Sequence, residues 1–233
     1  MSGIESYQPS LVAYAPEMDP KRKVRSLFLD GPAGRLEALW EEPSGSRTDL
    51  AGLVCHPHPL YGGTLHNKVV HHTSLALQER GLAVLRFNFR GAGKSQGKHD
   101  QGRGEGDDVR AALDWLAAER PGAGIVLAGF SFGAWVGLRV GCGDDRVRAL
   151  IGVGLPADSS DFGYLAECGK PKLFVQGTRD QYGSRRSVER VVKAAADPKE
   201  LIWIDEADHF FAGHLVALRR AILDHFPGDE PRS

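Results

Sequence analysis

The chain has 233 residues, of which 42% are hydrophobic, and its 29 basic and 30 acidic residues leave a net charge of −1. A nearly neutral chain has no overall electrostatic attraction to nucleic acid or to an anionic membrane, so neither is expected as a partner. Length and composition predict one globular domain over residues 1–233, with a lead-in segment at 1–23 and a frayed tail at 227–233.

The cysteines and the lengths of the apolar runs indicate in which cellular compartment the protein is expected. Cys55, Cys142 and Cys168 are odd in number and show no paired spacing, which indicates reduced thiols. The first residues lack a basic region followed by an apolar core, so no signal peptide is expected. No apolar run approaches the roughly 18 residues of a membrane span. We therefore expect a cytoplasmic protein that is not held in a membrane, and we make no prediction of its oligomeric state.

Short β-type runs alternate with helical patterns along the chain. Two strands flank the turn sequence DGPAG and predict a hairpin, and most later strands are continuous apolar runs, as in a parallel sheet covered on both faces. We expect strands at 24–29, 35–42, 50–55, 82–87, 124–130, 147–154, 172–177 and 200–205, and helices at 66–79, 106–119, 132–140, 187–196 and 211–224. This order predicts an α/β fold with a doubly wound, mostly parallel, eight-stranded sheet. Ligands in such folds lie beyond the carboxyl ends of the strands.

The sequence GFSFG at 129–133 lies between an expected strand and an expected helix. In the G-x-S-x-G turn the serine is held in a strained backbone conformation, and side chains at both glycine positions would collide with their surroundings. The turn would expose the Ser131 hydroxyl and point the Phe132 N–H toward a developing oxyanion. Ser131 is therefore the candidate nucleophile.

A serine nucleophile needs a base, and that base needs an acid to orient it. Asp180 follows the strand at 172–177 and His209 follows the strand at 200–205, so both lie at strand ends in the order that this turn requires. Asp205 and Asp208 are competing acids that lie very close to His209 in sequence, and His214 is expected inside the last helix. We predict Ser131, His209 and Asp180 as nucleophile, base and acid.

The stretch HPHPLYGGTLHNKVVHH at 56–72 holds five of the nine histidines and raises the alternative of a metal site. No acidic residue occurs from 56 to 78 and no H-E-x-x-H motif is present, so we expect neither a metal nor a cofactor. The later histidines are expected on a helix surface. GAGKS at 91–95 lacks the earlier glycine of a phosphate-binding loop, and Cys55 is expected to be a small buried residue.

These motifs, together with CHPHPLYGG at 55–63 and RFNFRGAGKSQG at 86–97, resemble the α/β-hydrolases over about residues 24–226. The resemblance extends to the small bacterial lidless serine hydrolases that carry HPHPxxGG, which are similar to dienelactone hydrolases. It implies the same three catalytic residues. Dienelactone hydrolases proper carry cysteine at the elbow, where this chain has Ser131, and the lipase sequence HGGG is absent.

In relatives of this fold the loop after the early strand supplies a second oxyanion N–H. In many relatives the pattern is H-G-x with the N–H of x as donor, and this resemblance, mapped onto His56-Pro57-His58, implies His58 as the best candidate. Pro57 and Pro59 have no N–H, and Leu60 and Tyr61 remain alternatives. His56 or His58 could also brace this loop by hydrogen bonds. Leu60, Tyr61 and Leu155 are expected to line the acyl pocket, and the residues from 155 to 171 are too few for a sizeable cap domain.

The expected function is a serine hydrolase that cleaves a carboxylic ester or related acyl bond of a small molecule through an acyl-enzyme intermediate. A peptidase, or a dienelactone or thioester hydrolase with the same three residues, is the alternative within this class. A non-catalytic binding protein with the same fold is the alternative outside it.

Overall fold

The computed structural model describes residues 22–227. The expected lead-in at 1–23 and tail at 227–233 therefore lie almost entirely outside the described residues. The chain order of strands and helices agrees with the order predicted from the sequence.

Eight strands form one sheet in the order β1-β2-β4-β3-β5-β6-β7-β8. β1 and β2 form an antiparallel hairpin, β2 also pairs antiparallel with β4, and all other neighbours are parallel. The strands span β1 Lys23–Gly31, β2 Gly34–Glu42, β3 Leu50–Cys55, β4 Ala83–Phe87, β5 Gly124–Phe130, β6 Val147–Val153, β7 Lys172–Gly177 and β8 Lys199–Ile204. The predicted fold class is confirmed.

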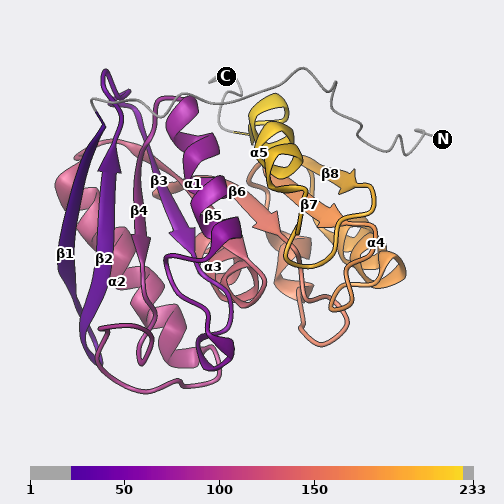
Figure 1. Ribbon diagram of the computed structural model, residues 1–233, viewed down its shortest axis with the longest axis horizontal. Helices are drawn as coiled ribbons and strands as arrows, with labels where there is room; N and C mark the ends of the chain where they lie inside the picture. The colour runs from indigo at the N-terminus through magenta and orange to yellow at the C-terminus, as the bar shows by residue number, and fades with distance from the viewer. Residues whose placement is uncertain (1–21, 228–233) are drawn as a thin grey trace.

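Helices cover both faces of the sheet (Figure 1). On one face α1 and α5 pack against each other and against the strands, and on the other face lie α2, α3 and α4. The helices span α1 Lys68–Glu79, α2 Arg103–Glu119, α3 Phe132–Cys142, α4 Arg185–Ala194 and α5 Leu215–Asp224. Each face has its own apolar core, and strands β3 and β5 are buried along their whole length. This double burial explains their unbroken apolar sequences.

Four helices begin at residues other than those predicted; α4 begins at Arg185 instead of 187, and the other three have a visible cause. Helix α2 begins at Arg103, before the predicted 106, because the side chain of Glu105 accepts a hydrogen bond from the N-cap Gly102 N–H. Helix α1 begins after Asn67, whose side chain accepts from the amides of the first turn. Helix α5 begins at Leu215 instead of 211, since Phe211 and Gly213 have positive φ values of 53° and 76°.

The connection from β6 to β7 holds one short 3₁₀ segment, η2 (Gly163–Glu167), and no inserted domain. The carboxyl ends of the parallel strands are therefore not covered by a cap, as the sequence predicts. The loops after β3, β4, β5, β6, β7 and β8 meet at this edge of the sheet. They form the site described below.

Candidate active site

Ser131 occupies the sharp turn between β5 and α3. Its backbone has φ 55° and ψ −120°, a region that costs a residue with a side chain on the order of 1–3 kcal/mol. The two glycines of GFSFG allow this turn. A Cβ on Gly129 would lie 2.4 Å from the carbonyl oxygen of Gly133, and a Cβ on Gly133 would lie 2.4 Å from that of Cys55. The collisions predicted from the sequence are thus present at both positions.

Three side chains from separate loops form one hydrogen-bonded row. The Ser131 Oγ lies 2.9 Å from the His209 Nε2, and the His209 Nδ1 lies 2.8 Å from the Asp180 Oδ2. Asp180 and His209 are buried, whereas the Ser131 side chain is partly accessible from the cavity. The distances fit a serine hydroxyl that gives its proton to an imidazole held by a carboxylate.

Asp180 is the acid that reaches His209. Its carboxylate also accepts from the Tyr182 N–H at 2.8 Å, the Gly183 N–H at 3.1 Å and the Gln176 Nε2 at 2.7 Å. Four donors around one carboxylate hold it in one orientation. The competing Asp208 accepts instead from the amides of Phe210 and Ala212 in its own turn.

Gln176 is a site residue that the sequence reasoning missed. Its side chain is fully buried at the end of β7, where it donates to Asp180 and accepts the Leu155 N–H at 2.7 Å. The signal was a lone amide in the apolar strand KLFVQG. His214, expected inside the last helix, is the residue that precedes its first turn, and its Nδ1 lies near the Ala212 carbonyl.

In the HPHP loop, the side chain of His56 forms hydrogen bonds to two main-chain groups. The buried His56 Nε2 accepts from the Phe89 N–H at 2.9 Å, so its Nδ1 carries the proton and donates to the Pro57 carbonyl at 2.6 Å. Burial lowers the pKa of His56 to about 4, which keeps the ring neutral. His56 therefore braces this loop against the loop after β4.

The amides that follow in this loop have partners. The Leu60 N–H donates to the His58 Nδ1, and the N–H groups of Tyr61 and Gly63 donate to the His58 carbonyl. The His58 N–H makes no hydrogen bond to any residue from 22 to 227. Of the three candidates for a second oxyanion donor, His58 is the one whose amide is not already engaged.

A cavity of about 720 Å³ lies over Ser131. Its lining includes Tyr61, as predicted, and also Phe132. Leu155, predicted in the pocket, is instead fully buried in the core, because its main chain follows β6 while its side chain turns inward toward Gly152. Leu60 is exposed and is not part of the lining.

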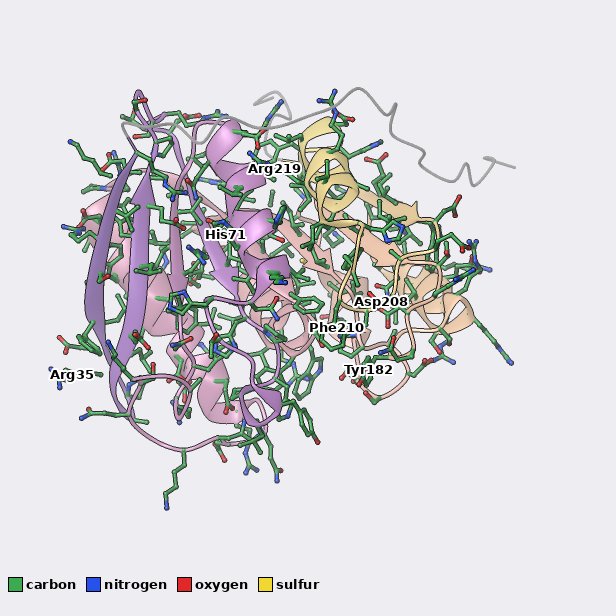
Figure 2. All side chains as sticks on the ribbon, viewed as in Figure 1. Arg35, His71, Tyr182, Asp208, Phe210 and Arg219 are labelled. Atoms are coloured by element: carbon green, nitrogen blue, oxygen red, sulfur yellow. The ribbon has the colours of Figure 1, made fainter. Side chains whose placement is uncertain are left out.

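The remaining walls come from residues that the sequence did not indicate. Trp135 lies on one side, and Tyr182 and Phe210 lie against the ring of His209 at the opening (Figure 2). Tyr182 and Phe210 are each 48% exposed, so the cavity is open to solvent. Tyr182 and Phe210 lie in loops and therefore show no periodicity in the sequence, whereas Trp135 lies on α3.

The other histidines of the stretch at 56–72 do not converge. His71 is half-buried rather than on an open helix surface, and burial together with the nearby Arg86 lowers its pKa to about 4. His72 is also half-buried, near Arg219. Within the described part of the chain, no three histidine, cysteine or acidic side chains form a group that could hold a metal ion. Nor is any helix there long and apolar enough to cross a membrane.

The fold agrees with the comparison with known proteins. Residues 54–216 match a protein family described as the alpha/beta hydrolase domain, and the chain belongs to that family. It is similar to an uncharacterized protein of Rickettsia prowazekii, with 37% identity over 85% of this chain and 87% of the relative.

Two solved structures are also similar. An alpha-beta serine hydrolase homologue from Coxiella burnetii shares 40% identity at a TM-score of 0.83, over 87% of this chain and 97% of that one. A serine hydrolase without a lid from Xanthomonas campestris shares 35% identity at a TM-score of 0.82, over 91% and 97% of the two chains. The chain is thus an α/β-hydrolase of the lidless type.

Proposed function

We propose that this protein is a serine hydrolase that cleaves a carboxylic ester of a small molecule through an acyl-enzyme intermediate. The observation that carries the proposal is the row from Ser131 through His209 to the buried Asp180, with donor–acceptor distances of 2.9 and 2.8 Å. The serine hydrolases with similar structures support the same reaction class.

In the proposed first step the Ser131 Oγ attacks the ester carbonyl while the His209 Nε2 takes its proton. The ionised Asp180 holds the His209 Nδ1–H and stabilises the imidazolium. The N–H groups of Phe132 and His58 then donate to the oxyanion, and His209 passes the proton to the departing alcohol. Water, activated by the same imidazole, releases the acid and restores Ser131.

Two features favour an ester over a peptide. The cavity over Ser131 has a volume of about 720 Å³, which suits a small ester. No inserted domain covers the site between β6 and β7, so nothing there would hold an extended chain. Lactones and thioesters are chemically close and remain the alternative substrates of the same residues.

A fluorophosphonate probe tests the proposal directly. We expect the probe to form a covalent adduct on Ser131, identified by peptide mass spectrometry, and to abolish hydrolysis of nitrophenyl butyrate. Ser131→Ala should lose both labelling and turnover while its circular dichroism and melting temperature stay close to those of the parent. A folded protein that fails to react would instead support a non-catalytic binding role.

A further inference from the structure

A second histidine–carboxylate pair lies in the wall of the same cavity. The His99 Nδ1 lies 2.7 Å from the Glu105 Oε1, and the Glu105 side chain is fully buried. Glu105 is itself held by the Asp100 N–H at 2.9 Å and the Gly102 N–H at 2.8 Å. Its role in capping α2 explains its burial, but not the histidine placed against it.

The two nitrogens of His99 have different surroundings. Nδ1 is buried, and its approach to Glu105 is a short electrostatic contact without the direction of a hydrogen bond. The His99 side chain is 12% exposed, and its ring lines the cavity. Nε2 makes no hydrogen bond to residues 22–227, so it is the nitrogen available to a ligand.

The ring contacts of His99 locate it relative to the reaction. His99 packs against His58 at a centroid distance of 4.7 Å and against Phe132 at 5.6 Å, the two residues proposed to supply the oxyanion donors. The departing alcohol must lie beside His209, where Tyr182 and Phe210 contact the imidazole. His99 therefore faces the acyl part of the substrate.

We propose that His99 is a specificity-determining residue that hydrogen-bonds a hydroxyl group on the acyl part, so that the preferred substrates are esters of hydroxy acids. This inference rests on the proposed serine hydrolase function. Glu105 acts as a positioning residue, because it orients the ring with Nδ1 inward and leaves Nε2 for the substrate.

The charges around the cavity favour a hydroxyl over a carboxylate. Asp161 lines the cavity and Glu105 lies behind His99, whereas no lysine or arginine within residues 22–227 is part of the lining. A substrate carboxylate would face these like charges without a fixed cation. A hydroxyl both donates and accepts, so it can pair with Nε2 whether that nitrogen carries a proton or not.

The test compares nitrophenyl esters that differ only at one group. β-Hydroxybutyrate is paired with its shape mimic isovalerate, and ω-hydroxyhexanoate with heptanoate, each rate divided by its hydroxide-catalysed rate. We expect kcat/KM to favour the hydroxy ester roughly three- to tenfold in at least one pair, as one added hydrogen bond allows. Nitrophenyl succinate should be a poorer substrate than either short ester.

Substitution of His99 identifies the source of that preference. Because each rate is already divided by its hydroxide-catalysed rate, His99→Phe should bring the kcat/KM ratio of hydroxy ester to matched ester to unity. His99→Gln, which keeps a donor and an acceptor, should restore part of the preference. His225→Phe is the matched control, because it removes a histidine that also lies 2.7 Å from a glutamate, Glu200, but outside the cavity. It should leave the ratio unchanged.

The outcomes are separable. Turnover of all esters with no preference for the hydroxyl, or a preference that survives in His99→Phe, overturns the role of His99 alone. A preference for succinate that His99→Phe removes shows that the ring binds an anion and overturns the hydroxyl assignment. Failure to hydrolyse any ester, together with no fluorophosphonate adduct, overturns the proposed function and this inference with it.

Discussion

Asp180 receives hydrogen bonds from two main-chain amides, one side-chain amide and the imidazole of His209. The geometry of His209 therefore depends on contacts made within β7 and the loop that follows it. Gln176 links this carboxylate to the Leu155 N–H, so the loops after β6 and β7 share one buried polar network. Such a network keeps the imidazole in place before substrate arrives.

Asp180→Asn tests the charge and the tautomer at the same time. The amide keeps the size of the side chain, but its NH₂ cannot accept the His209 Nδ1–H and cannot stabilise an imidazolium. We expect kcat to fall by about 10³–10⁴-fold, by analogy with such substitutions in other serine hydrolases. The measurement is the steady-state rate on a nitrophenyl ester, with Asp208→Asn as the matched control in the same region. An equal loss in both variants would contradict the assignment of the acid.

At the scale of the element, the elbow and the HPHP loop depend on each other. Gly133, in the first turn of α3, lies directly against the carbonyls of Cys55 and His56 at the end of β3. The two amides proposed as oxyanion donors therefore belong to segments in main-chain contact. A change that pushes these segments apart should weaken both stability and catalysis.

Gly133→Ala makes that change. Its Cβ would meet the Cys55 and His56 carbonyl oxygens at 2.4 and 2.5 Å, and neither backbone can move without shifting the loop. We expect a loss of about 1–3 kcal/mol in the free energy of unfolding, measured by urea denaturation, together with a lower kcat.

The control is Gly143→Ala at the other end of α3. There the nearest atom to the new Cβ is 3.9 Å away and the backbone φ is −93°, which alanine adopts freely. This variant should be unchanged or more stable by roughly 0.4–1 kcal/mol. If both variants lost the same stability, the close approach at Gly133 would not be the cause.

Periodicity and turn motifs predict the elements better than they predict their ends. Strands at 50–55, 124–130 and 172–177 match the structure in every residue, because buried parallel strands are bounded by clear turn signals. The start of α2 is not predicted because glycines at 102, 104 and 106 have low helix propensity, and Gly102 at the N-cap lacks the Ser or Thr side chain that marks a capping box in a sequence.

The same distinction applies to the site. Ser131, Asp180 and His209 were placed at strand ends by topology, and their side chains meet there. Position after a strand does not determine side-chain direction, which is why Leu155 was expected in the pocket and lies in the core. The aromatic walls come from α3 and from several loops, and only the folded chain brings them together.

At the scale of the whole molecule, buried neutral histidines make stability depend on pH. The pKa values of His56 and His71 are lowered from 6.5 to about 4 in the folded chain. Between these values the unfolded chain binds protons that the folded chain does not, so stability falls as the pH falls through that window. Above it, neither histidine contributes a pH dependence.

Urea denaturation at a series of pH values from about 7 to 4 measures this effect. The midpoint should decrease toward acid, and His71→Gln should flatten the decrease because one of the two groups is gone. His66→Gln replaces an exposed histidine just before α1 and should leave the slope unchanged. A slope that His71→Gln leaves intact would show that this ring does not take up a proton on unfolding.

The row of Ser131, Asp180 and His209 has a consequence for how activity appears during synthesis. The three residues follow β5, β7 and β8 in chain order, so His209 leaves the ribosome last of the three. A growing chain can therefore form the elbow and most of the sheet while its serine has no base. Under the proposed function, reactivity begins only after β8 has joined the edge of the sheet.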